Sequence, residues 1–157
     1  MKSINKKQLF IASCLSLLVT SLSFGIRAGI LNRLGVEFKL DASELATIAG
    51  TAFWGFPLAV IIGGMLVDAL GMKRLLVTAF ILHLIGIVLT IFAGGFWCLF
   101  LSTLFIGLAN GTVEAACNAL VVSRYQNNKT TKLNNFTVCF PGCILFVICI
   151  VYFFVRF

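Results

Sequence analysis

Charged side chains are scarce in this chain: of its 157 residues, Asp, Glu, Lys and Arg make up only 11%, and five residues are acidic. A soluble domain carries about 25% charged residues. Hydrophobic residues make up 61% of the sequence, and a globule of this length has too little interior to hide so much apolar surface from water. The composition therefore argues against a soluble enzyme or a DNA-binding module and predicts a polytopic membrane protein.

Signatures of catalysis and of metal binding are also missing from the sequence. It contains no His-Glu-x-x-His, no Gly-x-Ser-x-Gly and no Cys-x-x-Cys motif, and its single histidine is His83. The six cysteines lie in or beside apolar segments, where a thiol is a small packing group. We therefore expect no catalytic residue, no metal site and no cofactor.

Five apolar segments are long enough to cross a membrane, which takes about 20 residues of helix. They cover residues 9–31, 46–67, 75–93, 97–122 and 136–155. Each should be a helix, because backbone groups in hydrocarbon must be paired within their own segment. The predicted fold is an all-α membrane protein with five transmembrane helices and short loops, which form one domain over residues 1–157.

Basic residues between the segments indicate the orientation of the chain. If the N-terminus is cytoplasmic, the inner segments carry eight Lys and Arg residues and the outer segments carry three. This excess predicts a cytoplasmic N-terminus in a multi-pass protein of the cell inner (plasma) membrane. The net charge of +7 is then a topology signal, so we expect no nucleic-acid partner.

Two ionisable residues, Arg27 and Glu114, lie inside apolar segments, where insertion costs about 3 kcal/mol each. Asn110, Glu114 and Asn118 recur every four residues and therefore share one face of the fourth helix. Such a polar stripe favours a water-filled cavity or a polar partner. Glu114 could pair with Arg27, bond to neighbouring helices, or lie in a solute or proton pathway. His83 is either a packing residue or a proton relay.

A short turn joins the second and third segments, where residues 64–74 read GMLVDALGMKR. Its acid, Asp68, precedes two adjacent bases, Lys73 and Arg74. A basic turn with an acid at the helix end can form a charge clasp between two helix termini. A plain inside-positive turn would explain the two bases but not the spacing of the glycines and the acid.

This turn resembles the loop between helices two and three of the major facilitator superfamily of secondary transporters, which reads Gly-x-x-x-Asp-Arg-x-Gly-Arg-Arg/Lys. Four positions fall on that pattern: Gly64, Asp68, Gly71 and Lys73. Ala69 and Met72 depart from it.

A second stretch, residues 107–118, is similar to the fourth helix of fucose-permease-like sugar/proton symporters. That helix carries Glu-x-Ala-x-Asn, which corresponds here to Glu114, Ala116 and Asn118. The resemblance implies that Glu114 serves solute binding and proton coupling. Near Arg27 those permeases have an aspartate, and an arginine there would suit an anionic solute.

The resemblance implies a partial domain, since the superfamily has two six-helix halves with the solute site between them. This chain resembles the first five helices, without the sixth helix and the second half. The implied function is secondary active transport of a small polar solute, a sugar or an organic anion, by proton-coupled alternating access in the intact parent. An alternative from another class is a self-standing five-helix scaffold or assembly subunit, and a channel is a further rival.

Residue roles follow from the same resemblance. The expected solute-binding and coupling residues are Glu114, Asn118, Asn110 and Arg27. The expected cytoplasmic gate consists of Gly64, Asp68, Gly71, Lys73 and Arg74. The expected partners are a small-molecule solute, a proton or other coupling ion, the lipid bilayer, and the missing C-terminal half or another copy of the chain.

Overall fold

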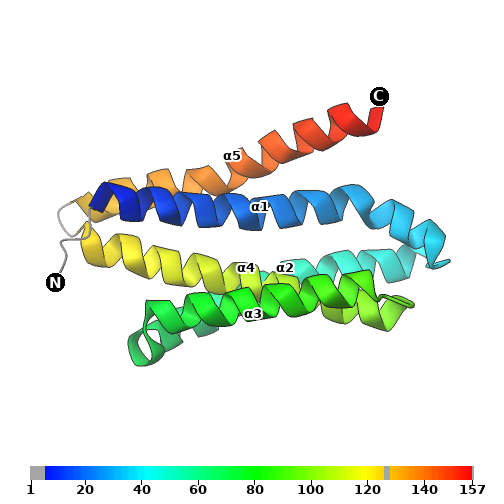
Figure 1. The fold of residues 1–157 in the computed structure, drawn as a ribbon, viewed down its shortest axis with the longest axis horizontal. Coiled ribbons are helices and arrows are strands. Elements are labelled where there is room, and N and C mark those ends of the chain that lie inside the picture. Colours follow the sequence, from blue (N-terminus) through cyan, green and yellow to red (C-terminus); the bar gives the residue numbers. More distant parts are fainter. Residues whose placement is uncertain (1–5, 126–127, 157) are drawn as a thin grey trace.

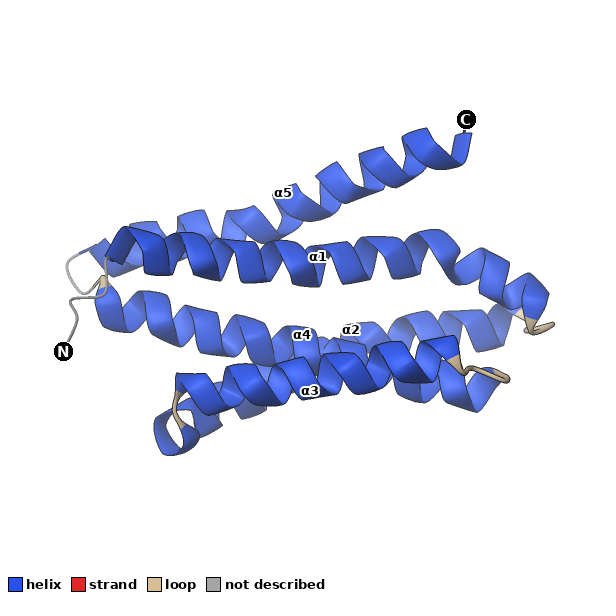
Figure 2. Ribbon diagram, in the orientation of Figure 1, coloured by secondary structure: helices blue, strands red, loops and turns tan. Residues whose placement is uncertain are grey.

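The computed structural model describes residues 6–125 and 128–156, and regular structure in these ranges is entirely helical (Figures 1 and 2). The five helices are α1 (Lys6–Glu37), α2 (Ala42–Leu70), α3 (Met72–Ile91), α4 (Phe96–Arg124) and α5 (Lys129–Arg156). Four of them, α1 to α4, are long and apolar enough to span a membrane. The all-helical membrane fold is thereby confirmed, whereas the role of α5 as a fifth span stays a prediction.

α4 is the central helix of the bundle. It packs extensively against α2 and α3, while α1 packs mainly against α5 (Figure 1). Half of the most apolar window of α4 is buried inside the protein, against 28% or less for the other three candidate spans. Functional residues on α4 are therefore held by contacts with several neighbouring helices.

Small residues bring the backbones of α2 and α4 into contact. Gly107 lies against the backbone of Ala52, and Gly111 lies against the carbonyl of Phe56. A Cβ built on Gly111 would also lie 2.8 Å from the Cβ of Ala59. The four-residue glycine spacing on α4 is therefore a helix-packing surface of the kind that membrane helices use.

Replacing Gly111 with alanine is expected to destabilise the bundle, because the new methyl group would collide with the Phe56 carbonyl. Overpacking of this kind costs about 1–3 kcal/mol, which for a chain of this size lowers the melting temperature by roughly 2–12 °C. Thermal unfolding in detergent, followed by circular dichroism, measures the shift. Gly50→Ala is the matched control, because no atom lies within 4 Å of the added Cβ. An equal effect of the two substitutions would contradict this packing.

The helices extend beyond the predicted apolar spans. The expected loop between residues 31 and 46 is instead a short turn at 38–41, because Asp41 and Glu44 form a capping box that starts α2 early. The backbone N–H of Glu44 donates to Asp41 Oδ1 at 2.7 Å, and that of Asp41 donates to Glu44 Oε2 at 3.0 Å. Polar first and last turns are helical too, which an apolar window does not detect.

The connection between α2 and α3 is shorter than predicted. Gly71 alone separates the two helices, with φ of 78° and ψ of 152°, a conformation that favours glycine. Its N–H donates to the carbonyl of Val67 at 2.9 Å, which closes the last turn of α2. The charged residues predicted for a loop, Asp68, Lys73 and Arg74, therefore lie on the helix ends.

Candidate functional site

Two rows of residues define the faces of α4. Asn110 and Cys117 face α1, because Asn110 bonds to Ser23 and Cys117 belongs to a core cluster with Leu17. Gly111 belongs to the row that faces α2. At 100° per residue, Glu114 lies about 40° from Asn110 and about 60° from Gly111 on the other side. The Glu114 side chain therefore starts from the strip of α4 between the two neighbouring helices.

Asn118 continues this strip by one further turn, four residues beyond Glu114 on the same helix. Each residue has one buried oxygen without a hydrogen-bond partner, Glu114 Oε2 and Asn118 Oδ1. An unsatisfied buried polar atom is uncommon in proteins, and each instance calls for a physical explanation. These are the two such side-chain atoms among the residues that the structure describes.

Asn110 lies deeper than the other two members of the predicted stripe. Its side chain is completely buried and bonds to Ser23 on α1, with Nδ2 donating to Ser23 Oγ at 3.2 Å. Asn110 thus joins α1 to α4. The three residues of the predicted stripe therefore differ in their surroundings. Asn110 links α1 to α4, whereas Glu114 and Asn118 lie on the strip of α4 between α1 and α2.

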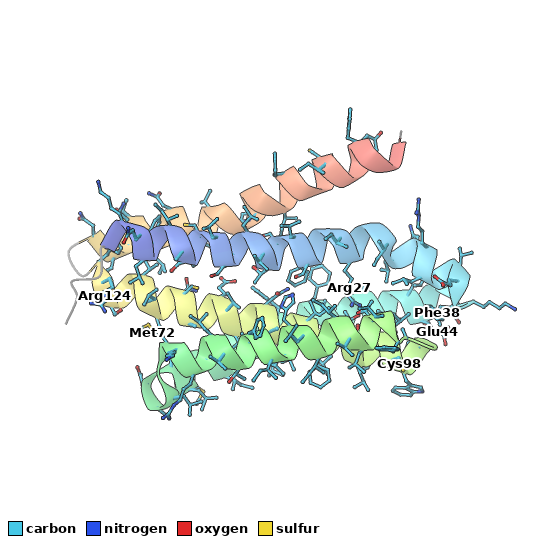
Figure 3. All side chains as sticks on the ribbon, in the orientation of Figure 1. Arg27, Phe38, Glu44, Met72, Cys98 and Arg124 are labelled. Atoms are coloured by element: carbon cyan, nitrogen blue, oxygen red, sulfur yellow. The ribbon has the colours of Figure 1, made fainter. Side chains whose placement is uncertain are left out.

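Arg27 lies on another side of the bundle, between α1 and the ends of α3 and α4 (Figure 3). Its guanidinium donates to three hydroxyls: Thr90 Oγ1 at 2.5 Å, Ser102 Oγ at 2.8 Å, and Thr103 Oγ1. Thr90 and Ser102 also bond to each other at 2.6 Å. In the described part of the chain, Arg27 forms no ion pair with Glu114.

This hydroxyl cluster was not anticipated from the sequence. Thr90 and the Ser102-Thr103 pair are small polar residues near the outer ends of two apolar segments, and such residues are common in membrane helices. The available signal was the buried arginine itself, since an arginine in hydrocarbon needs hydrogen-bond acceptors from neighbouring helices. The sequence does not specify which helices supply them.

The expected gate residues gather at the α2–α3 connection. Asp68, Lys73 and Arg74 are exposed, and within the described ranges no ion pair joins the acid to either base. Gly64 has no atom within 4 Å of an added Cβ, whereas Gly71 makes the turn. The structure therefore places Asp68, Lys73 and Arg74 at the adjoining ends of α2 and α3, and the role of these residues as a gate stays a prediction.

A groove that contains His83 and an aromatic pocket lie on two other sides of the bundle. His83 lines a groove between α1 and α3, away from the strip that carries Glu114. Phe24, Phe53 and Phe56, with Ile144, line a pocket of about 200 Å³ between α1, α2 and α5. The rings of Phe24 and Phe56 meet edge to face, with centroids 5.9 Å apart. An aromatic pocket therefore lies on the side of the bundle where α1 and α2 meet.

Comparison with known proteins identifies the family. The helices define a polytopic membrane protein. The sequence pattern of the Major Facilitator Superfamily matches residues 9–141. The chain therefore belongs to the Major Facilitator Superfamily, whose members are transporters and not enzymes.

One similar protein is the solute carrier family 2, facilitated glucose transporter member 10, from Xenopus laevis. It is 27% identical over 106 residues, which make up 68% of this chain and 19% of that transporter. No solved structure matches the chain. The family expected from the α2–α3 turn is confirmed, and the fucose-permease-like subgroup stays a prediction.

Proposed function

We propose that this chain contributes to secondary transport of a small polar solute, with Glu114 and Asn118 on the solute path. The observation that carries the proposal is the pair of buried oxygens without partners, Glu114 Oε2 and Asn118 Oδ1. Burying a carboxylate oxygen without a partner is costly unless a proton, water or a bound group satisfies it. A solute hydroxyl and a transferable proton are groups of that kind.

Proton coupling is the finer part of the proposal. Glu114 is not neutralised by a base in the described residues, so its charge is free to change with the state of the transporter. A carboxyl group on an internal face can hold a proton when the solute is bound and release it when the solute leaves. Symport follows if the two binding events stabilise each other.

Arg27 and Asn110 act in this proposal by positioning helices. Asn110 is fully buried in its contact with α1, and Arg27 is already bonded to three hydroxyls of α3 and α4. Both hold α1 against the centre of the bundle, which fixes the wall beside Glu114. This geometry favours a positioning role over direct solute contact.

A sugar is the solute class that we place first. The Phe24–Phe53–Phe56 pocket offers aromatic edges and faces beside α1 and α2, and carboxyl and amide groups can hydrogen-bond sugar hydroxyls. The similar protein from Xenopus laevis is named as a glucose transporter. An organic anion comes second, because it would require Arg27 to give up hydroxyl partners.

Counterflow uptake into liposomes tests the proposal. The chain alone and the longest expressed product that contains it are each reconstituted into liposomes. The liposomes are loaded with unlabelled solute, and labelled sugars or labelled organic anions are then added outside. We expect counterflow of at least one sugar. Counterflow of organic anions alone would contradict the sugar assignment. If no solute exchanges with either protein while both are folded in the bilayer, the scaffold alternative replaces transport.

The gate residues give a separate prediction. In the proposed cycle, Asp68 closes on Lys73 or Arg74 to hold the outward-open state. Asp68→Asn removes the charge and should bias the carrier toward the inward-open state. Thiol labelling of a single cysteine at an inner position of α4 should then increase, with Asp41→Asn as an exposed acid control at the other end of the bundle. Unchanged labelling of the Asp68→Asn variant would count against the clasp.

The same proposal places the N-terminus in the cytoplasm and the chain in the cell inner membrane. Arg124 at the end of α4 lies beside Met72 at the start of α3, at the same end of the bundle as the N-terminus of α1 (Figure 3). Lys73 and Arg124, two of the predicted cytoplasmic bases, therefore lie near each other at one end of the bundle, in keeping with the positive-inside rule.

A further inference from the structure

The carboxyl group of Glu114 and the amide group of Asn118 have the same unmet requirement. Glu114 Oε2 and Asn118 Oδ1 are both buried, and each lacks a hydrogen-bond donor. The two residues are four apart on α4, which is the spacing at which helical side chains are neighbours. An ionised carboxylate and an amide oxygen only accept hydrogen bonds, so these two atoms cannot satisfy each other without an added hydrogen.

The donor that these oxygens need has to be small. Both oxygens are covered by the residues that the structure describes, so neither has open surface against which a water molecule or a further side chain could lie. A buried water needs space of its own and several polar partners. A proton on the carboxyl group needs no extra space, and it converts Oε2 from an acceptor into a donor.

The two helices beside Glu114 offer it no charged partner in the described ranges. On α2, Gly63 is the residue that lies against α4. Asp68 is five residues further along and therefore about 140° around α2, where it is exposed. On α1, the guanidinium of Arg27 bonds to Thr103, which lies about 16 Å from Glu114 along α4. A neutral carboxyl group therefore suits this position better than an ionised one.

Other titratable groups on the packed helices are held elsewhere. Cys117, on α4 itself, belongs to the core cluster that faces α1. Glu44 caps the start of α2, and Lys132 of α5 lies over two aromatic rings. His83 of α3 lines the groove on another side of the bundle. None of these groups supplies the missing donor to Glu114.

We infer that Glu114 is a protonated acid in this conformation and that Asn118 holds its proton in place, with Oδ1 accepting the hydrogen bond from the acid hydroxyl. An asparagine amide can serve both states of the glutamate, because a half-turn about its Cβ–Cγ bond exchanges the oxygen for the nitrogen, which is a donor. On ionisation the proton passes to water, and Asn118 then donates to the carboxylate. Asn118 is thus a positioning residue for the proton. The inference rests on the proposed coupling role of Glu114 and gives it a defined partner.

Infrared absorption of the solute-free protein in liposomes at neutral pH tests the inference. A carboxylic acid has a C=O stretching band that an ionised carboxylate lacks. The chain contains five acidic residues, which makes the assignment of a single band practical. We expect one acid band in the unmodified protein, and this band should be lost in Glu114→Gln.

Variants at position 118 locate the hydrogen bond. Leucine has a similar branched shape but no hydrogen-bonding atom, so Asn118→Leu should move the acid band to higher wavenumber. Asn118→Gln keeps an amide and should shift the band less. Asn135→Leu, which removes an exposed amide from α5, is the matched control and should leave the band unchanged. Circular dichroism of each variant checks that the helices are intact.

Three outcomes would overturn the inference. Absence of the acid band, or its survival in Glu114→Gln, would mean that Glu114 is ionised. A Glu114 band that keeps its position in Asn118→Leu would assign the hydrogen bond to another acceptor. Equal shifts in Asn118→Leu and Asn118→Gln would assign the change to packing. The measurement needs no solute, so a protein that shows the expected bands without counterflow would keep this inference and lose the proposed transport function.

Discussion

Glu114→Gln should abolish solute accumulation driven by a proton gradient in whichever form of the protein shows counterflow. Glutamine keeps the size and hydrogen-bonding capacity of the side chain but can neither take up nor release a proton. Without that proton the inward gradient can no longer be coupled to the solute. The effect is measured as uptake of labelled solute into liposomes with an imposed pH gradient, and we expect a fall to the level of empty liposomes.

Counterflow by the same variant separates two roles of Glu114. Exchange of labelled for unlabelled solute needs no net proton movement, so a purely coupling residue leaves it intact. If the carboxylate also accepts a hydrogen bond from the solute, counterflow falls as well. Glu37→Gln, an exposed acid at the end of α1, is the matched control. Normal gradient-driven uptake by Glu114→Gln would remove this residue from the mechanism.

Arg27→Lys should strongly destabilise the bundle, although it preserves the charge. A lysine ammonium is a point donor and cannot reproduce the fork that reaches Thr90, Ser102 and Thr103 on two helices. A buried charge that loses its partners costs about 3 kcal/mol. For a chain of this size the melting temperature should fall by roughly 6–12 °C, as measured by circular dichroism in detergent.

Arg27→Leu should destabilise the bundle less than Arg27→Lys. Leucine removes the buried charge together with its desolvation cost, so its effect on stability should be much smaller than that of lysine. The three hydroxyls are not left without partners. Thr90 and Thr103 still donate to backbone carbonyls at 2.9 and 2.7 Å, and Ser102 Oγ still bonds to Thr90 Oγ1 at 2.6 Å. If both variants instead fold normally and lose counterflow of an anion, Arg27 contacts the solute and does not act by positioning α1.

The sequence was sufficient to predict the membrane fold, the approximate positions of the helices and the family. Apolar length determines which segments can cross a bilayer, and the spacing of Gly64, Asp68 and Gly71 is specific. Helix ends were less predictable. The capping box at Asp41 and the left-handed Gly71 are local backbone features, and hydropathy does not report them.

The sequence predicted which residues belong to the candidate site but not which partners they contact. Periodicity placed Asn110, Glu114 and Asn118 on one face of a helix, which the structure retains. It could not show that Asn110 bonds to Ser23 while the other two keep oxygens without partners, because that depends on how α1 crosses α4. The surroundings of Arg27 were unpredictable for the same reason: its acceptors come from two other helices.

Thiol accessibility at position 118 tests most directly whether the Glu114 strip is the solute path. In a cysteine-free background, Asn118→Cys is labelled with a water-soluble, membrane-impermeant maleimide in liposomes of the transporting form, with and without solute. Leu84→Cys, in the groove between α1 and α3 that His83 also lines, is the control. We predict that position 118 reacts and that solute slows its labelling, while position 84 does not react. Labelling of position 84 with solute protection, and none at 118, would place the solute path on the opposite side of the bundle.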